Sequence, residues 1–315
     1  MPTLSEYAKL SQDELEQSVY ENIITEDALA PLLQFEEFSG NSLLYDRENT
    51  LPTSATHTVG DIWSDSDATY TQKSATLTEV GVQSSLPRYV SQTRGNVMSQ
   101  EAQLFKGMAK SLMRKIGNLI ITGEPEATTT HWEGLDSLCR SETRMMAMDD
   151  GAVDGPGAAE TELTLDRFDA FSDLIEKGDP DAYVMNKTMR RKLTALSRDA
   201  GSGVVMDSIE MFGHQVSTYN HIPIIINDHI TNSEQYNDTS TWTSSTATSI
   251  FALKFGKDNQ GYTIIHNGPV MSPDIQELGT KFDKNEDAFR MAVYIQAITY
   301  SAKMVASLGG IDSAA

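Results

Sequence analysis

Few residues in this chain are placed where catalytic chemistry would need them. Asp228 is the best single candidate, because it follows the apolar run at residues 222–226 and a carboxylate at the end of a buried strand can be sheltered. The neighbouring carboxylates Asp149 and Asp150 lie instead in a glycine-rich polar stretch. The sequence contains no phosphate-binding loop, dinucleotide-binding glycine pattern or nucleophile elbow. We therefore expect no catalytic residue; an acidic hydrolase that uses Asp228 and nearby histidines is the alternative.

Metal and cofactor sites are also poorly supported. The single cysteine, Cys139, excludes an intrachain disulfide and leaves no sulfur cluster for a metal. Asp61, Asp65 and Asp67 are close together, but they lack the glycine and the distal glutamate of a calcium loop, which favours a solvated turn. We expect no metal and no cofactor. Metal-ligand spacing is likewise absent among the histidines, which are His57, His131, His214, His221, His229 and His266.

Four basic residues form a cationic row. Lys106, Lys110 and Arg114 are four residues apart, so they gather on one face of a helix, and Lys115 is beside them in the sequence. Such a row can bind the phosphates of a nucleic acid without sequence preference. It can equally pair with acidic residues within the subunit or in a neighbouring subunit, because charge rows on helices are usually solvated or paired. The sequence leaves both roles open.

The element that carries this row is a long helix at residues 95–123. Ser99 is a suitable N-cap, and Gly123 followed by Pro125 ends the helix. About 25 residues at ~1.5 Å each give a rod of nearly 40 Å, long enough to act as a spine for other elements. Apolar residues recur at helical spacing, at Leu104, Phe105, Met108, Ala109, Leu112, Met113, Ile116 and Ile120.

The chain as a whole is strongly acidic. Asp and Glu total 45 against 24 Lys and Arg, which gives a net charge of -21 and a pI near 4.5. In dilute buffer this self-repulsion destabilises a compact chain and opposes its assembly. At molar salt the Debye length falls to about 3 Å, so exposed charges are largely screened. Abundant Asp and scarce Lys favour adaptation to a salty cytoplasm over an ordinary acidic protein.

Two segments before the spine lack the apolar content of a domain core. Residues 1–47 contain one acidic amphipathic helix, which begins near Ser11, and form an arm. Residues 48–96 are rich in Thr and Ser and predict a long two-stranded excursion with polar faces. Because a hairpin alone is only marginally stable in water, it requires a partner surface, and another subunit is the obvious candidate. We find no membrane-span pattern and no secretory signal.

Regular elements follow the spine. A helix extends from Leu165 through Ile175 to Lys177, Asn186 caps a second helix, and buried strands are expected at residues 183–185, 222–226, 249–255 and 262–265. The last element alternates strictly, which favours a strand. Its apolar face comprises Phe289, Met291, Val293, Ile295 and Ala297.

Short fragments accompany this order of elements: WEGL at 132–135, DAYVMN at 181–186, GHQV at 213–216, IPII at 222–225 and AKMVASLGGI at 302–311. Together with the arm, the polar hairpin and the spine, they resemble the major capsid protein of tailed bacteriophages and of related archaeal tailed viruses. The resemblance covers almost the whole chain. It implies an α+β capsid fold with four parts, mapped onto this chain as an N-terminal arm at 1–47, an extended β-hairpin loop at 48–96, a peripheral domain with the spine helix at 97–162 and 270–315, and an axial domain at 163–269.

The resemblance also implies partners. Copies of the chain would form the pentamers and hexamers of an icosahedral shell in the virion, assembled in the host cytoplasm. The spine helix would face inward, where Lys106, Lys110, Arg114 and Lys115 could contact packaged double-stranded DNA non-specifically. Portal, scaffolding and decoration proteins are further expected partners, and a membrane is not. Some relatives crosslink subunits through a hairpin lysine, but no matching motif surrounds Lys73, so we expect no crosslink.

Three functions therefore remain. The capsid of a tailed virus of a halophilic host is favoured, because it accounts for a hairpin without a core and for the lack of a catalytic constellation. An encapsulin-like nanocompartment shell shares the fold but holds a cargo enzyme instead of DNA. The acidic cytoplasmic hydrolase is the third and would be a soluble monomer or small oligomer with a closed pocket.

The charge balance makes a first prediction. The thermal unfolding midpoint should rise between about 0.1 M and molar KCl, because the Debye length shortens from about 10 Å to about 3 Å and carboxylate repulsion is screened. Differential scanning calorimetry across a KCl series would measure this. Equal stability at low and at molar salt would contradict adaptation to a salty cytoplasm.

Overall fold

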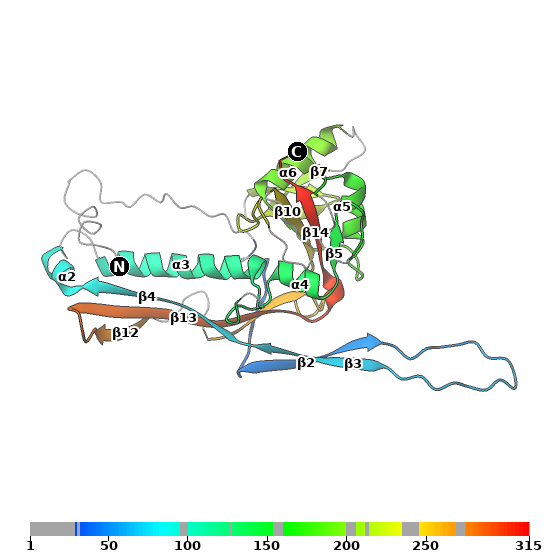
Figure 1. The fold of residues 1–315 in the computed structure, drawn as a ribbon, viewed down its shortest axis with the longest axis horizontal. Helices are drawn as coiled ribbons and strands as arrows, with labels where there is room; N and C mark the ends of the chain where they lie inside the picture. Colours follow the sequence, from blue (N-terminus) through cyan, green and yellow to red (C-terminus); the bar gives the residue numbers. More distant parts are fainter. Residues whose placement is uncertain are drawn as a thin grey trace.

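The structure is a computed structural model, and it is an elongated α+β molecule (Figure 1). One long helix lies beside long strands, a compact body sits at one end of the helix, and a two-stranded limb leads away from the body. The predicted mixed α+β class is confirmed. The structure describes residues 29, 32–94, 100–125, 128–153, 160–199, 206–211, 214–234, 246–268 and 275–314. The helix predicted near Ser11 lies outside these residues.

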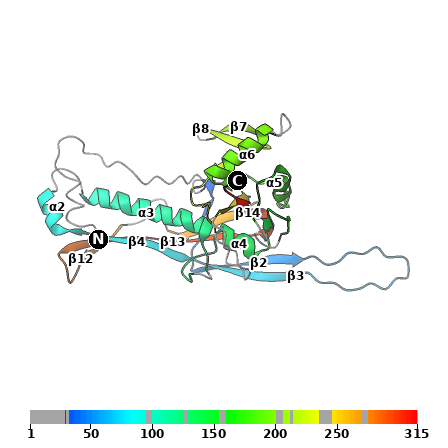
Figure 2. The same ribbon diagram turned by 45° about the horizontal axis from the view of Figure 1, so that its top comes forward.

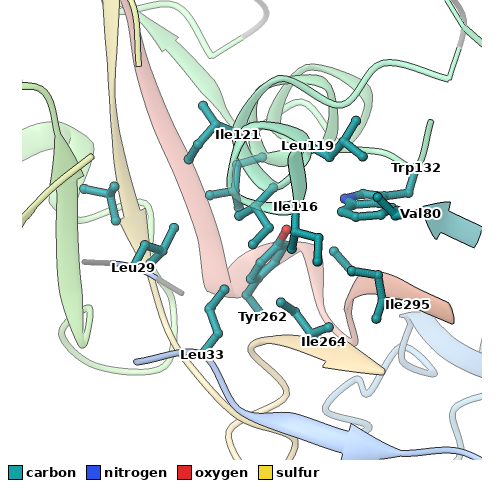
Figure 3. Packing of buried hydrophobic residues seen from close by; sticks show 14 of the residues in the cluster. Leu29, Leu33, Val80, Ile116, Leu119, Ile121, Trp132, Tyr262, Ile264 and Ile295 are labelled. Atoms are coloured by element: carbon teal, nitrogen blue, oxygen red, sulfur yellow. The ribbon is translucent and has the colours of Figure 1, made fainter. Parts of the chain in front are cut away.

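The spine is α3 (Gln100–Thr122), a helix of 23 residues that ends before Gly123, as predicted. The N-cap predicted at Ser99 lies outside the described residues. The buried apolar residues of α3 form a stripe that packs against β4 (Thr78–Pro87) and β13 (Glu286–Thr299). Figure 3 shows Ile116 of this stripe directed toward Tyr262 in the same core. The buried residues of the helix are Met108, Leu112, Ile116, Leu119, Ile120 and Ile121.

A five-stranded sheet lies under the spine, with β13 at its centre. On one side β13 pairs with β4, and on the other it pairs with β12 and then with β11, all antiparallel. The predicted alternation is confirmed, because Phe289, Met291, Val293, Ile295 and Ala297 are buried while Arg290 and Tyr294 are exposed. The remaining strands are β1 (Phe35–Glu37), β11 (Tyr262–Asn267) and β12 (Ile275–Thr280).

The hairpin is shorter than predicted. Its ladder consists of β2 (Ser42–Thr50) and β3 (Thr69–Thr76), whereas β4 belongs to the five-stranded sheet and is followed by α2 (Arg88–Arg94). The single excursion predicted over residues 48–96 is therefore wrong beyond Thr76. Three apolar side chains decide this, because Val80, Leu86 and Val90 are buried in the core that includes α3.

The compact body contains a seven-stranded sheet in the order β5-β14-β10-β6-β9-β8-β7. Against it, Phe168 lies 4.9 Å from the rings of both Tyr183 and Tyr219, centroid to centroid. β14 pairs with β10 and β5, although residues 270–315 were assigned to the peripheral domain with the spine; the domain boundaries stay a prediction. The strands are β5 (Met145–Ala147), β6 (Ala182–Met185), β7 (Met206–Met211), β8 (His214–Tyr219), β9 (Ile222–Ile226), β10 (Ala247–Leu253) and β14 (Val305–Asp312).

Local signals in the body are mostly as expected. The side chain of Asn186 accepts a hydrogen bond of 2.8 Å from the Met189 backbone N–H, which confirms the predicted cap of α6 (Lys187–Asp199). In contrast, α5 (Leu165–Ser172) ends before the predicted Lys177. The N–H groups of Leu174 and Ile175 donate to carbonyls three residues earlier, so the chain forms tight turns there instead of further α-helix. β8 and β9 are joined by Asn220 and His221 at φ 49° and 68°, the backbone of a two-residue hairpin turn.

The segment between the spine and the short helix α4 (Leu135–Ser141) begins at Gly123 and ends at Gly134, and these two glycines are in contact. The Gly134 N–H donates to the Gly123 carbonyl at 2.7 Å, and Trp132 beside them is buried. A Cβ added to Gly134 would lie 2.4 Å from the Gly123 nitrogen and 2.8 Å from the Leu119 oxygen. These are backbone atoms and have no room to move. The WEGL fragment is therefore a close contact between two backbone segments.

This contact yields a second prediction. Gly134→Ala should lower the free energy of unfolding by about 1–3 kcal/mol, because the added methyl group overpacks a rigid site. The matched control is Gly107→Ala on the exposed face of α3, where a Cβ would meet nothing within 4 Å. It should stabilise the chain by about 0.5–1 kcal/mol. Denaturant unfolding at one salt concentration would measure both, and equal stability of the two variants would contradict the close contact.

Candidate functional site: assembly and interior surfaces

The residues that could have been catalytic are engaged in structural contacts. Asp228 forms an ion pair with Lys187 at 3.3 Å, at the start of α6. Cys139 is buried, and that burial raises the pKa of its thiol far above the ordinary value, so it is no nucleophile at neutral pH. Asp149 and Asp150 accept backbone N–H groups at 2.8 Å each, from Asp150 and Ala152, and shape a surface turn. These groups do not form a catalytic constellation.

The described residues also hold no group of three or more His, Cys, Asp and Glu side chains able to bind a metal ion. Of the predicted aspartates, Asp61 accepts hydrogen bonds from the backbone and hydroxyl of Thr58, at 2.6 and 2.9 Å. These bonds lower the pKa of its carboxyl. Among the described helices, none combines the length and the apolar character needed to cross a membrane.

The β2–β3 limb extends away from the rest of the molecule (Figures 1 and 2). Its ladder runs from the pair Ser42–Thr76 to the pair Thr50–Thr69, and residues 51–68 continue it as a long loop. Almost every side chain in that loop is exposed. A segment with so little buried surface has little to hold it in one conformation within a single copy of the chain.

The tip of the limb is nevertheless ordered by its own contacts. The rings of His57 and Trp63 stack with centroids 4.1 Å apart, and the backbone N–H of Thr53 donates to the Ser66 hydroxyl at 2.8 Å. The tip presents apolar side chains to water, since Ile62 is 95% and Trp63 75% exposed. Exposed apolar groups gathered in one place mark an interaction surface. We call residues 51–68 the hairpin tip.

The opposite end of the molecule carries a second exposed apolar surface. Every residue of β12 is exposed, and this strand forms an edge of the five-stranded sheet. In Figure 1, α2 and β12 lie at the far end of the long axis from the hairpin tip. An uncovered edge strand can pair with another chain. The exposed apolar side chains at this end are Tyr89, Ile275, Leu278 and Phe282.

Lys106, Lys110 and Arg114 lie on the side of α3 opposite its buried stripe, and Lys115 lies about 100° around the helix from Arg114. Lys106, Arg114 and Lys115 are exposed and Lys110 is partly buried. Within the described part of the chain, Lys106 and Arg114 form no ion pair. The Lys115 ammonium is 3.5 Å from the His131 ring, and burial together with this charge lowers the pKa of that histidine. The predicted helical face thus exists, and its role stays a prediction. We call these four residues the basic row.

Comparison with known proteins identifies the architecture. A family model for the type 2A encapsulin shell protein, SrpI-like, matches residues 169–309. The holo-SrpI encapsulin complex of Synechococcus elongatus PCC 7942 matches with a TM-score of 0.72 at 14% identity, covering 100% of this chain and 97% of that one. The chain has the capsid fold that encapsulins share with tailed-phage heads. No curated protein sequence matches it.

Two viral-type shells share this capsid fold. The capsid of a native GTA particle has a TM-score of 0.65 at 14% identity, over 96% of this chain and 95% of the other. A structure from Microbacterium phage Oxtober96 has a TM-score of 0.62 at 11% identity, over 97% of this chain and 98% of the other. The fold implied by the sequence resemblance is confirmed. These matches show that the chain has the fold of shell and capsid proteins.

Sequence reasoning missed the apolar hairpin tip. It identified the limb as polar and needing a partner, but it did not single out Ile62 and Trp63. A signal was present, because this apolar pair is flanked by Asp61 and by Ser64 and Asp65 in a stretch made mostly of small residues. A large aromatic residue inside a polar loop is the composition of an interface anchor.

A third prediction concerns this tip. Replacing Ile62 and Trp63 together with serine should lower the assembled fraction by about tenfold or more, since a buried aromatic anchor at an interface is worth about 2 kcal/mol or more. Light scattering and negative-stain electron microscopy would measure it. The unfolding midpoint of the chain should not fall, because both side chains are exposed within one copy. Normal particles from this double variant would show that the hairpin tip is not part of the interface between subunits.

Proposed function

We propose that this chain is the subunit of an encapsulin-type shell, in which many copies self-assemble and enclose a protein cargo. The observation that carries the proposal is the agreement of two independent comparisons. The family model built on type 2A encapsulin shells and the holo-SrpI structure, which covers 100% of the chain at a TM-score of 0.72, indicate the same type of shell. Such a compartment resides in the cytoplasm.

The surfaces support assembly. A limb whose tip exposes apolar side chains and an exposed sheet edge at the other end are what a subunit presents before its neighbours cover them. Both surfaces are too exposed to stabilise a single copy. Pentamers and hexamers of the chain, closed into a shell, are the assembly that this fold implies.

The capsid of a tailed virus is the second candidate. The sequence resemblance favours a viral capsid over the other functions, and the similarity in fold to GTA and phage structures over nearly the whole chain supports it. The basic row is the specific observation on its side, because three cations on one face of α3, with Lys115 next to them, form a surface suited to a packaged polyanion in a chain with net charge -21. In this case portal, scaffolding and decoration proteins would join the particle.

The contents of purified particles distinguish the two functions, which gives the fourth prediction. Particles treated with nuclease before disruption should release one predominant protein besides the shell subunit and little nucleic acid. Mass spectrometry and the ratio of absorbance at 260 and 280 nm would measure this. Protected double-stranded DNA of uniform length would instead establish the viral capsid. The absence of any particle would reject both.

The basic row can be tested in the same particles. Replacing Lys106, Lys110 and Arg114 with glutamine should leave the number of particles unchanged and reduce any nucleic acid that co-purifies at low salt, because phosphate contacts are lost. The control is a triple variant with the same charge change at exposed residues of the compact body, Lys177→Gln with Arg191→Gln and Arg198→Gln. Loss of particles from the first variant alone would show that the row belongs to an interface between subunits.

A further inference from the structure

The limb is attached to the body at a polar groove of about 760 Å³. The groove lies between the first part of the β2–β3 ladder, the end of α4 and the end of β13. On β2 the side chains alternate, so that Leu43, Tyr45 and Arg47 face the body while Leu44 and Asp46 face water. An arginine facing inward is unusual in such a pattern, because a charged group is seldom buried unless it is paired.

Each of the three guanidinium nitrogens of Arg47 donates a hydrogen bond to the body. Its Nη1 donates to the Glu142 carboxylate at 2.6 Å, its Nη2 to the Thr299 carbonyl at 2.6 Å, and its Nε to the Tyr300 carbonyl at 2.9 Å. The side chain is only 11% exposed. A planar guanidinium that bonds three acceptors from two different elements permits one orientation, because its donors point in fixed directions. Arg47 therefore fixes both the position and the angle of β2.

Glu142 has a second partner on the same limb. Lys73 of β3, which pairs with Tyr45 across the ladder, donates to the same carboxylate oxygen at 3.2 Å. Both strands of the limb thus bind one side chain of the body. Burial alone would raise the pKa of Glu142, but the hydrogen bonds and charges of Arg47 and Lys73 outweigh it and lower that pKa.

The position of Glu142 has no explanation within its own helix. It is the C-cap residue of α4, where the negative end of the helix dipole disfavours a carboxylate. The contact with Arg47 supplies the reason, since the two residues are 95 positions apart and meet only because of the tertiary fold. The pair is a specific link between limb and body.

Apolar packing at the root is slight by comparison. The buried apolar residues of the described cluster there are Ala75, Ile265 and Ile298, and partly buried side chains that include Leu43 and Leu77 pack against them. The rings of Tyr45 and Tyr300 meet edge to face at 5.6 Å, and the Tyr45 hydroxyl donates to the Thr299 carbonyl at 3.2 Å. Apolar contacts are not directional, so they set the angle of the limb less sharply than the hydrogen bonds of Arg47 do.

A small change at the root becomes a large one at the tip. From Arg47 to Gly60 the chain spans about 40 Å at roughly 3.3 Å per residue. A rotation of about 10° at the root would therefore move the tip by about 7 Å, which is more than the diameter of a water molecule and enough to undo a packed interface.

We propose that Arg47 and Glu142 are positioning residues for shell assembly, which set the angle of the limb and with it the spacing between copies. The inference rests on the proposed shell function. Among the described contacts between limb and body, this pair has the most directional geometry. It acts on assembly through the hairpin tip.

Two readouts test the proposal. Arg47→Met should broaden the distribution of particle diameters or reduce correctly closed particles at least tenfold, as counted by electron microscopy. In the same variant, amide hydrogen exchange in β2 and β3 should accelerate at least tenfold, while exchange in α3 and β13 stays unchanged. Lys257→Met is the matched control, because it removes the ion pair with Glu36 beside the same groove and leaves Arg47 in place. It should behave as the wild type.

Further variants separate positioning from the loss of a charge. Arg47→Lys keeps the charge opposite Glu142 and loses the fork of donors, so it should be intermediate. The double variant Arg47→Met with Glu142→Gln removes the buried carboxylate as well, and the Lys73 ammonium that it frees is 45% exposed to water. It should remain as defective as Arg47→Met alone. Recovery in the double variant would overturn the proposal, because the defect would then come from a buried carboxylate that had lost Arg47.

Two other outcomes are decisive. Wild-type particle diameters and unchanged exchange in Arg47→Met would overturn the positioning role. If the wild-type chain forms no particles, the proposed function fails, and hydrogen exchange in β2 and β3 still decides whether the pair holds the limb.

Discussion

The apolar seam between α3 and the strands β4 and β13 is the interaction on which the rest of the structure depends. One helix stripe covers one face of a long strand pair, and Phe105 and Phe289 meet across it edge to face at 5.0 Å. Both sheets are attached to this seam, because β13 continues through the short 3₁₀ turn Ala302–Met304 into β14 of the seven-stranded sheet. The limb is attached to its end through Thr299 and Tyr300.

The parts of the fold that could be predicted are those with a local signal. Strict alternation identified β13, spacing identified α3, and Asn186 identified the start of α6, because each signal lies within a few residues of the element it specifies. β4 was missed, since its place in the sheet depends on pairing with a strand some 200 residues later. Because β4 has few aliphatic side chains, its sequence is like that of a polar hairpin strand, although Val80 and Leu86 are buried beneath α3.

The candidate surfaces divide in the same way. The basic row was predictable as a helical face, whereas the link from Arg47 to Glu142 joins positions 95 residues apart and leaves no local pattern. What a shell of this fold encloses is a separate question from how its subunit folds. An encapsulin complex and the capsid of a GTA particle share this fold, so the fold alone does not specify what a shell encloses.

The two exposed apolar surfaces lie at opposite ends of one elongated molecule and differ from each other. A contact between unlike ends leaves one end open after every addition, and only a closed ring or shell satisfies all of them. Intermediate aggregates therefore keep exposed edges and dissolve more readily than finished ones. Assembly of such a subunit should begin sharply above a threshold concentration, with monomers and complete particles coexisting and little in between.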